Sequence, residues 1–238
     1  MSGRKKSPAL ATTKRVLVVD DHPMLREGLA QLIGNEPDLS VCGEAENAHE
    51  AIAKVNALKP DLVLADITLP GKSGLEFIKD AQAMRPGLPV LVVSMHDESV
   101  YAERVLRAGG RGYIMKQEGG KKLMEAIRRV LAGHIYVSEK MSAKILEVFS
   151  GHRRGTANRP VEKLTDREFE VFQLIGQGKT TRAIATHLHL SVKTVEVHRA
   201  NIKQKLQLKT GPELIHYAVR WAESEGHGDA NGSTPTGS

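Results

Sequence analysis

The sequence predicts an α/β domain built on a doubly wound, five-stranded parallel sheet, followed by a small all-α domain of four helices. Within residues 15–135, short apolar runs alternate five times with segments of helical periodicity, which is the pattern of strands joined by crossover helices. From residue 164 onward, apolar residues recur only at helical spacing, in four short segments. The chain therefore divides into two domains of different class.

Turn-forming residues set the bounds of the elements in the first domain. Lys59-Pro60, Pro86-Gly87 and Gly109-Gly110 each end a helical pattern. Pro23 suits the first turn of a helix, and Asn47 suits an N-cap. The predicted strands are residues 15–19, 39–45, 62–65, 89–94 and 112–116, and the predicted helices are residues 23–33, 48–58, 75–84, 100–108 and 121–132.

Composition narrows the classes of protein that fit. The 238 residues suffice for two domains, and Cys42, the one cysteine, excludes an intrachain disulfide and favours a reducing compartment. No apolar run approaches the roughly 18 residues of a membrane span, and the basic start of the chain lacks the apolar region of a signal peptide. We therefore expect a cytoplasmic protein without a membrane partner. The net charge of +6 is compatible with binding to nucleic acid.

Two of the predicted strands end in carboxylates. Asp20 and Asp21 follow the first strand, and Asp66 follows the third. A lone aspartate at such a position is better explained as a turn cap. Three acids at the carboxyl edge of one sheet, where α/β folds place their ligands, repel one another unless a cation lies among them. Oxygen ligands with room for water suit Mg²⁺, so we expect a magnesium site here.

Two more strands deliver polar groups to the same edge. Ser94 ends the fourth strand and Lys116 ends the fifth. Taken singly, Ser94 suits a turn and Lys116 suits an ordinary surface lysine. Together with the acids they indicate phosphoryl chemistry, because a carboxylate can act as nucleophile while Mg²⁺, a lysine and a hydroxyl bind the phosphoryl oxygens.

Residues 14–135 resemble a receiver domain of two-component signalling. The resemblance is carried by Asp20-Asp21, Asp66 with Pro70 and Gly74 behind it, Ser94, Tyr113 and Lys116. It implies a flavodoxin-like fold in which Asp66 accepts a phosphoryl group from a sensor histidine kinase. It further implies that Mg²⁺ is held by Asp21, Asp66 and the backbone carbonyl of Thr68, with Asp20 acting nearby, and that Lys116 pairs with the phosphoryl group.

The resemblance also implies a switch made of Ser94 and Tyr113. The hydroxyl moves to the phosphoryl group, and the ring follows into the vacated space. Two positions depart from the family pattern. Gln117 stands where many receivers have proline, and the bulk of Met95 narrows access to Asp66. Both departures bear on how long a phosphoryl group persists.

A connector separates the two domains. Residues 138–149 have apolar residues on one helical face, which predicts a helix that packs on a neighbour. Residues 150–160 lack apolar periodicity and are rich in turn formers and arginine, which indicates a flexible linker. The expected organisation is a disordered basic tail at residues 1–14, a receiver at 15–135, the connector at 136–163, a DNA-binding domain at 164–225 and a disordered tail at 226–238.

The second domain contains a predicted helix-turn-helix. Thr165 and Glu168 form a capping box that begins the first helix, Thr180 or Thr181 begins a short second helix, and a third helix spans residues 192–206. Helical geometry predicts that this third helix turns Val192, Val195, Ile202 and Leu206 inward.

The opposite face of the third helix is basic and polar, as a major-groove helix requires. Its flanking lysines are expected to bind phosphate, and the head of Arg199 is expected to reach a phosphate while its stem packs. The candidate DNA-binding residues are Lys193, Thr194, Glu196, Val197, His198, Arg199, Ala200, Asn201, Lys203 and Lys205.

Residues 164–222 resemble the LuxR-type DNA-binding domain, so the whole chain resembles a response regulator of the NarL/FixJ class. The resemblance is carried by Leu164-Thr165, Arg167-Glu168, Gly178, Ile184-Ala185, Ser191, the run Thr194–Ile202 and Lys205-Leu206. It implies a transcription regulator, not an enzyme, that binds double-stranded DNA as a homodimer through a fourth helix. In the resting state we expect the receiver to cover the recognition helix.

Two alternatives remain open on the sequence. A phosphohydrolase with an aspartate nucleophile shares this sheet, although such enzymes commonly carry a second aspartate where this chain has Thr68. The other alternative is a DNA-binding regulator whose receiver is gated by a ligand or a partner instead of by phosphorylation.

Overall fold

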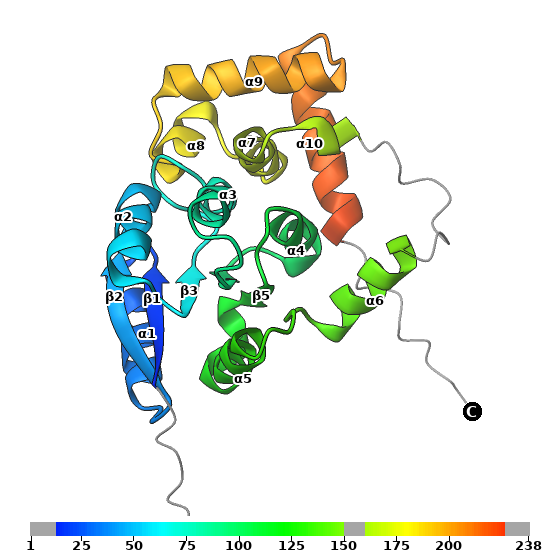
Figure 1. Ribbon diagram of the computed structural model, residues 1–238. Helices are drawn as coiled ribbons and strands as arrows, with labels where there is room; N and C mark the ends of the chain where they lie inside the picture. Colours follow the sequence, from blue (N-terminus) through cyan, green and yellow to red (C-terminus); the bar gives the residue numbers. More distant parts are fainter. Residues whose placement is uncertain (1–12, 150–159, 227–238) are drawn as a thin grey trace, which may run out of the picture.

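The computed structural model describes residues 13–149 and 160–226 (Figure 1). Our expectations for most of the basic tail, for the linker at 150–159 and for residues 227–238 lie outside these ranges. Within the part that is described, no helix combines the length and the apolar character needed to cross a membrane.

The first domain contains a five-stranded sheet in the order β2-β1-β3-β4-β5. Every neighbouring pair is parallel, which confirms the predicted fold class. The strands β1 and β3 are neighbours, so the residues that follow them meet at one edge. The strands are β1 Lys14–Val19, β2 Leu39–Ala45, β3 Leu62–Ala65, β4 Val90–Ser94 and β5 Gly112–Met115.

Five α-helices cover the sheet, and three of them begin at a residue whose side chain caps the helix. The Asn47 side chain accepts the amide of Glu50, and Ser73 forms a capping box with Glu76. Lys116 lies one residue beyond the last strand, in a short 3₁₀ turn that the sequence did not indicate. The helices are α1 Pro23–Gly34, α2 Ala48–Leu58, α3 Gly74–Met84, α4 Glu98–Arg107 and α5 Gly119–Leu131, and the 3₁₀ turn η1 is Lys116–Glu118.

Each face of the sheet has its own apolar core. Residues of α1 and α5 pack on one face, and residues of α2, α3 and α4 pack on the other. The core on the α2–α4 face continues without interruption into the second domain, whereas the α1–α5 core stays within the first. The two domains are thus joined on one side of the sheet only.

The second domain is a bundle of four helices in which α8, a tight turn and α9 form the helix-turn-helix (Figure 1). Thr165 and Glu168 form the predicted capping box, and Thr180 caps α8. His189, in the turn, adopts the left-handed conformation with φ of 53°. The elements after β5 and α5 are α6 Glu139–Phe149, η2 Pro160–Lys163, α7 Asp166–Gly176, α8 Thr181–His187, α9 Val192–Leu206 and α10 Gly211–Gly226.

Gly74 begins α3 directly against the loop that carries Asp66. Its amide donates to the carbonyl of Ile67 at 2.7 Å. A Cβ at this position would lie 2.4 Å from the Asp66 carbonyl oxygen and 2.6 Å from the Ile67 Cα. Both contacts are with backbone, so only glycine lets the helix approach the loop this closely.

Candidate functional site

Two aspartates and a lysine meet at the carboxyl edge of the sheet. Lys116 Nζ lies 2.7 Å from Asp20 Oδ2 and 2.8 Å from Asp66 Oδ2, and each of these three side chains is at most 7 % exposed. The strands that precede them are β1, β3 and β5, so residues far apart in sequence converge as the parallel sheet predicts. The edge is therefore a buried, charged site.

The charges at this edge influence one another strongly. Burial raises the pKa of Asp66; Lys116 opposes the rise, and Asp20 adds to it. Burial by itself disfavours the charged form of Lys116, but the attraction of the two carboxylates outweighs it and raises the lysine pKa. The lysine therefore stays protonated and compensates the two carboxylates.

Asp21 completes a group of possible metal ligands. Oxygen atoms of Asp20, Asp21 and Asp66 and a ring nitrogen of His22 all lie within 4.8 Å of one another. Asp21 Oδ1 is buried and, among the described residues, accepts no well-formed hydrogen bond, although His22 Nδ1 lies 2.7 Å away. A carboxylate oxygen left in this way, beside two further acids, is suited to a hard divalent cation such as Mg²⁺.

Thr68 and Ser94 both contact His96, a residue that the sequence did not single out. Thr68 Oγ1 lies 3.0 Å from His96 Nε2, and the backbone amide of His96 donates to Ser94 Oγ at 3.2 Å. Burial lowers the pKa of His96 to about 4, so its ring is neutral at physiological pH. The predicted switch hydroxyl therefore already has a partner within the loop after β4.

Tyr113 occupies the interior. Its ring is 1 % exposed, and its hydroxyl donates to the backbone oxygen of His96 at 2.9 Å. We expected the ring to enter the interior only after Ser94 moves. In the structure the ring is inside while Ser94 still accepts the His96 amide.

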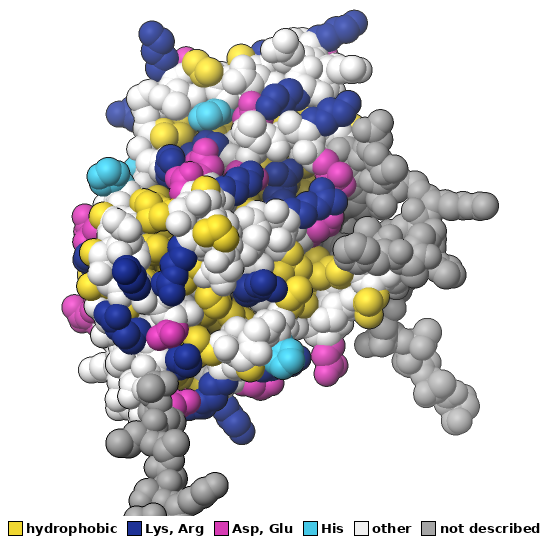
Figure 2. All heavy atoms as spheres, in the orientation of Figure 1, with side chains coloured by type: hydrophobic (Ala, Val, Ile, Leu, Met, Phe, Trp, Pro, Cys, Tyr) yellow, Lys and Arg dark blue, Asp and Glu magenta, His cyan; other side chains and the backbone are white. Residues whose placement is uncertain are grey.

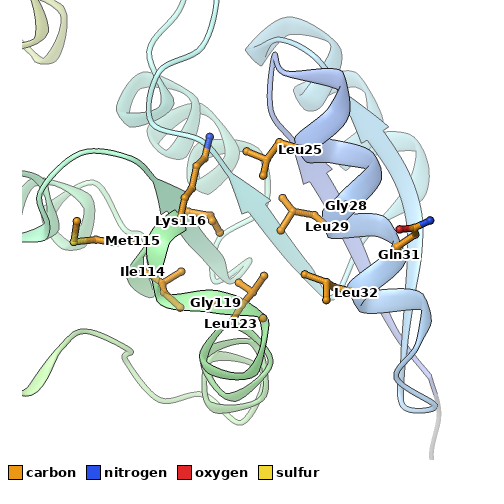
Figure 3. A pocket seen from close by; sticks show the side chains of 12 residues that line it. Leu25, Gly28, Leu29, Gln31, Leu32, Ile114, Met115, Lys116, Gly119 and Leu123 are labelled. Carbon is orange, nitrogen blue, oxygen red and sulfur yellow. The ribbon is translucent and has the colours of Figure 1, made fainter.

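An apolar pocket of about 370 Å³ lies between α1 and α5, beside the acidic edge (Figure 3). Lys116 lines one end, and its ammonium group points away from the pocket towards the carboxylates. Met24, on α1, is 87 % exposed. Besides Lys116, the residues that line the pocket include Leu25, Leu29, Leu32, Ile114 and Leu123. The surface next to Asp66 thus offers apolar contact area.

The domains meet chiefly where α4 faces α7. Tyr101 packs edge-on against Phe169, with ring centroids 5.5 Å apart. The Arg104 guanidinium lies 3.8 Å above the same ring and donates to the carbonyl oxygens of Val161 and Leu164 at 2.9 and 3.3 Å. One arginine of the first domain thus binds both the ring and the backbone of the second.

Polar contacts surround this apolar centre. Lys79 Nζ lies 2.6 Å from Asp166, and Arg167 donates to the Gly71 carbonyl at 2.5 Å. Arg167 also binds Glu170 Oε2 at 2.5 Å, while burial raises the pKa of Glu170 to about 7. A buried glutamate with a raised pKa therefore lies beside an interdomain contact.

The outward face of α9 is exposed, which corrects our expectation that the receiver covers the recognition helix. Lys193, Glu196, Val197, Ala200 and Asn201 are all accessible to solvent. Basic side chains project along the edge of the molecule formed by this helix (Figure 2). The first domain instead contacts α7 and the turn before α9, where His189 Nε2 lies 3.7 Å from Asp21.

Three other expectations for α9 need correction or refinement. Val192 is 43 % exposed, so it is not part of the inward face with Val195, Ile202 and Leu206. Lys205 Nζ binds Glu168 at 2.6 Å within the domain, so it is not a free phosphate ligand. His198 is half-buried. Thr194, Arg199 and Lys203 also lie at the margin of the exposed face.

Sites of this kind, followed by a helix-turn-helix domain, define the class of response regulators. Residues 16–128 match the family model described as the response regulator receiver domain, and residues 162–218 match the model described as bacterial regulatory proteins, luxR family. The chain belongs to the two-component response regulators of the NarL/FixJ class, in which a receiver precedes a LuxR-type domain.

Individual relatives support this assignment over nearly the whole chain. The oxygen regulatory protein NreC of Staphylococcus haemolyticus is 35 % identical over 210 residues, which are 87 % of this chain and 97 % of that protein. NreC of Staphylococcus aureus strain JH9 is 37 % identical over 210 residues, which again are 87 % of this chain and 97 % of that protein.

Two solved structures resemble the fold. A LuxR-family two-component response regulator from Aurantimonas sp. SI85-9A1 has 34 % identity and a TM-score of 0.55 over 58 % of this chain and 99 % of that chain. RcsB from Salmonella enterica serovar Typhimurium, bound to promoter rprA with the phosphomimetic BeF₃⁻, has 24 % identity and a TM-score of 0.58 over 87 % of this chain and 99 % of that chain. At that identity, RcsB supports the fold alone.

Proposed function

We propose that this protein is a transcription regulator switched by Mg²⁺-dependent phosphorylation of Asp66, with a sensor histidine kinase as the phosphoryl donor. One observation carries the proposal: the ammonium group of Lys116, which follows β5, lies within 2.8 Å of the buried carboxylates of both Asp20 and Asp66. A third acid, Asp21, lies beside this pair, and among the described residues its buried Oδ1 accepts no well-formed hydrogen bond.

The proposed transfer uses the carboxylate of Asp66 as the nucleophile. Its Oδ2 attacks the phosphorus of a phosphohistidine, the N–P bond breaks as the O–P bond forms, and the histidine nitrogen takes up a proton. Lys116, held 2.8 Å from that oxygen, then pairs with a phosphoryl oxygen. Ser94 is the hydroxyl that turns towards the phosphoryl group, with Tyr113 behind it.

Asp20, Asp21 and Asp66, with the carbonyl of Thr68, are the residues that would hold Mg²⁺. Bound there, the ion neutralises the charge that develops on the phosphoryl oxygens. The residues present fit this cation because carboxylate oxygens of Asp20, Asp21 and Asp66 lie within 4.8 Å of one another. The exposed Met24 and the neighbouring apolar pocket supply contact area for a kinase beside the acceptor.

In the second domain we assign the exposed face of α9 to the major groove of DNA. Lys193, Glu196, Val197, Ala200 and Asn201 are the residues able to meet base edges, and the flanking cations bind phosphate. Homodimers joined through α10 would read half-sites about one helical turn apart. A cytoplasmic location agrees with this role.

The test is phosphorylation in Mg²⁺ with acetyl phosphate, followed by borohydride trapping and peptide mass spectrometry. The proposal requires the modification on Asp66, its loss in Asp66→Asn and in chelator, and tighter binding of the modified protein to DNA. Stable labelling of Asp66→Asn, or steady turnover of small phosphate esters, would contradict it and favour a hydrolase.

A further inference from the structure

His96 touches both the acceptor edge and the domain interface. On one side, its Nε2 is 3.0 Å from the hydroxyl of Thr68, which follows Asp66 by two residues. On the other side, the centroid of its ring lies 5.2 Å from the centroid of the Tyr101 ring. Both distances are direct contacts, so a single side chain spans the gap between the site and α4.

The backbone of His96 is held by the two proposed switch residues. Its amide donates to Ser94 Oγ at 3.2 Å, and its carbonyl oxygen accepts from Tyr113 at 2.9 Å. A turn of the Ser94 hydroxyl towards a phosphoryl group removes its lone pair from the His96 amide. Because the ring of Tyr113 is already buried, phosphorylation cannot act by moving this ring inward. We therefore expect the loop that contains His96 to move instead.

Beyond His96, contacts between aromatic rings lead into the second domain. Tyr101 packs on Phe169 with centroids 5.5 Å apart, and Phe169 packs on Trp221 of α10 at 5.6 Å. Arg104 lies over Phe169 from the side of the first domain. Aromatic contacts of this kind depend on ring geometry, so displacement of one ring changes the next contact.

We propose that His96 is a positioning residue that couples the acceptor site to the domain interface, through Thr68 and Ser94 on one side and Tyr101 and Phe169 on the other. This inference rests on the proposed phosphorylation of Asp66. When Ser94 turns to the phosphoryl group, the loop at His96 shifts, its ring leaves Tyr101, and the contact between Tyr101 and Phe169 weakens. The domains then separate along α4 and α7.

Two other contacts also join the acceptor side to the second domain. His189 reaches Asp21 only at 3.7 Å and is 56 % exposed, so this ion pair contributes little. Arg167 binds the carbonyl of Gly71, on the loop after Asp66. If these contacts transmitted the coupling between the acceptor site and the interface, removal of the His96 ring would leave that coupling unchanged.

The experiment is a double-mutant cycle on the affinity for BeF₃⁻ in Mg²⁺, measured by calorimetry on the full chain. Arg104→Ala opens the interface without touching the acceptor edge, because the partners of Arg104 are Phe169, Asp166 and the carbonyls of Val161 and Leu164, all in the second domain or the segment that leads into it. If BeF₃⁻ binding weakens the contact between the domains, then weakening that contact by mutation must strengthen BeF₃⁻ binding by the same coupling free energy. We expect the affinity for BeF₃⁻ to rise about fivefold or more.

In a His96→Ala background the same Arg104→Ala change should no longer alter BeF₃⁻ affinity. Thr68→Val, which keeps the shape of the side chain and removes the hydroxyl, is the second background and should reduce the effect in the same direction. His49→Ala, on an exposed position of α2, is the matched control and should leave the full effect.

An equal gain in the His96→Ala and unsubstituted backgrounds would overturn the proposal, as would the absence of any gain in the unsubstituted chain. Failure of BeF₃⁻ to bind the unsubstituted chain, or equal binding to Asp66→Asn, would instead overturn the proposed function. The fluorescence of Trp221, the chain's one tryptophan, gives a second reading because its ring packs on Phe169. BeF₃⁻ should change it in the unsubstituted chain and not in His96→Ala.

Discussion

Lys116 and Asp66 form a buried ion pair whose charged atoms are 2.8 Å apart, and the same ammonium group lies 2.7 Å from Asp20. One positive charge thus serves two carboxylates that would otherwise repel each other in a poorly solvated site. Such a lysine keeps the aspartate ionised, and therefore nucleophilic, and it is already in place to meet a phosphoryl oxygen.

Lys116→Met should lower the free energy of unfolding by about 3–5 kcal/mol, because it leaves two buried carboxylates without their cation. It should also slow labelling of Asp66 by acetyl phosphate. Denaturant unfolding and labelling rates measure the two effects. Lys122→Met is the matched control, since Lys122 is 61 % exposed and pairs with Glu118, the residue just before α5. A Lys116→Met chain as stable as the control would refute the central role of this ion pair.

Gly74→Ala should destabilise the receiver by about 1–3 kcal/mol through overpacking, because the new methyl group meets the backbone of Asp66 and Ile67. The acceptor loop should shift, so labelling of Asp66 should fall as well. Gly28→Ala is the control: nothing lies within 4 Å of its Cβ, and alanine favours a helix. Thermal unfolding compares the two variants, and equal midpoints would show that the close approach of α3 is not required.

The closed arrangement of the domains should weaken as pH rises. In the closed form burial lifts the pKa of Glu170 from 4.5 to about 7 against the opposing effect of Arg167, with Glu76 and Asp166 adding to the rise. The closed form therefore binds the proton more tightly than a form with Glu170 in water. Its stabilisation is complete below pH 4.5 and is lost as pH rises through about 7.

Trp221 fluorescence, followed between pH 4.5 and pH 7, measures this change. The glutamine of Glu170→Gln stays neutral and should remove the part of the pH dependence that Glu170 causes, so the difference between the two chains isolates the contribution of this glutamate. Identical profiles for the two chains would show that Glu170 does not link protonation to closure.

Lys203 and Lys205 should behave differently although they are two residues apart. Lys203→Ala should reduce the slope of log affinity for DNA against log salt by about one, as loss of a phosphate contact does. Lys205→Ala should chiefly lower stability, because it leaves Glu168 without the partner that, with Thr165, holds its pKa down despite burial. Filter binding at several salt concentrations and thermal unfolding separate the two; a lower salt slope for Lys205→Ala alone would reverse the assignment.

Local patterns in the sequence were sufficient for the elements and for the acidic edge. In a parallel sheet each apolar run ends at the same edge, so Asp20, Asp66 and Lys116 converge once the strand order is known. Capping residues such as Asn47 and Thr165 act on atoms three residues away, which is why the starts of α2 and α7 were predicted correctly, whereas α4 and α5 begin two residues before the predicted positions 100 and 121.

Contacts over long sequence distances were not predictable in this way. Lys205 looked free because its partner Glu168 lies 37 residues earlier on another helix. Tyr101 and Arg104 occupy ordinary helix positions, and nothing near them in sequence indicates that Phe169 covers them. His96 gave no signal because both of its ring contacts, Thr68 and Tyr101, depend on the packed loop after β4. The docking of the domains on α4 is encoded in complementary surfaces, not in periodicity.

The most direct test of the account is the site of the phosphoryl group after reaction with acetyl phosphate in Mg²⁺. Intact-mass measurement of the full chain, followed by peptide mapping after borohydride trapping, locates it. The account predicts one modification, on Asp66, that is lost with Asp66→Asn and strongly reduced with Lys116→Met. A modification at any other residue, or undiminished labelling of Asp66→Asn, would contradict it.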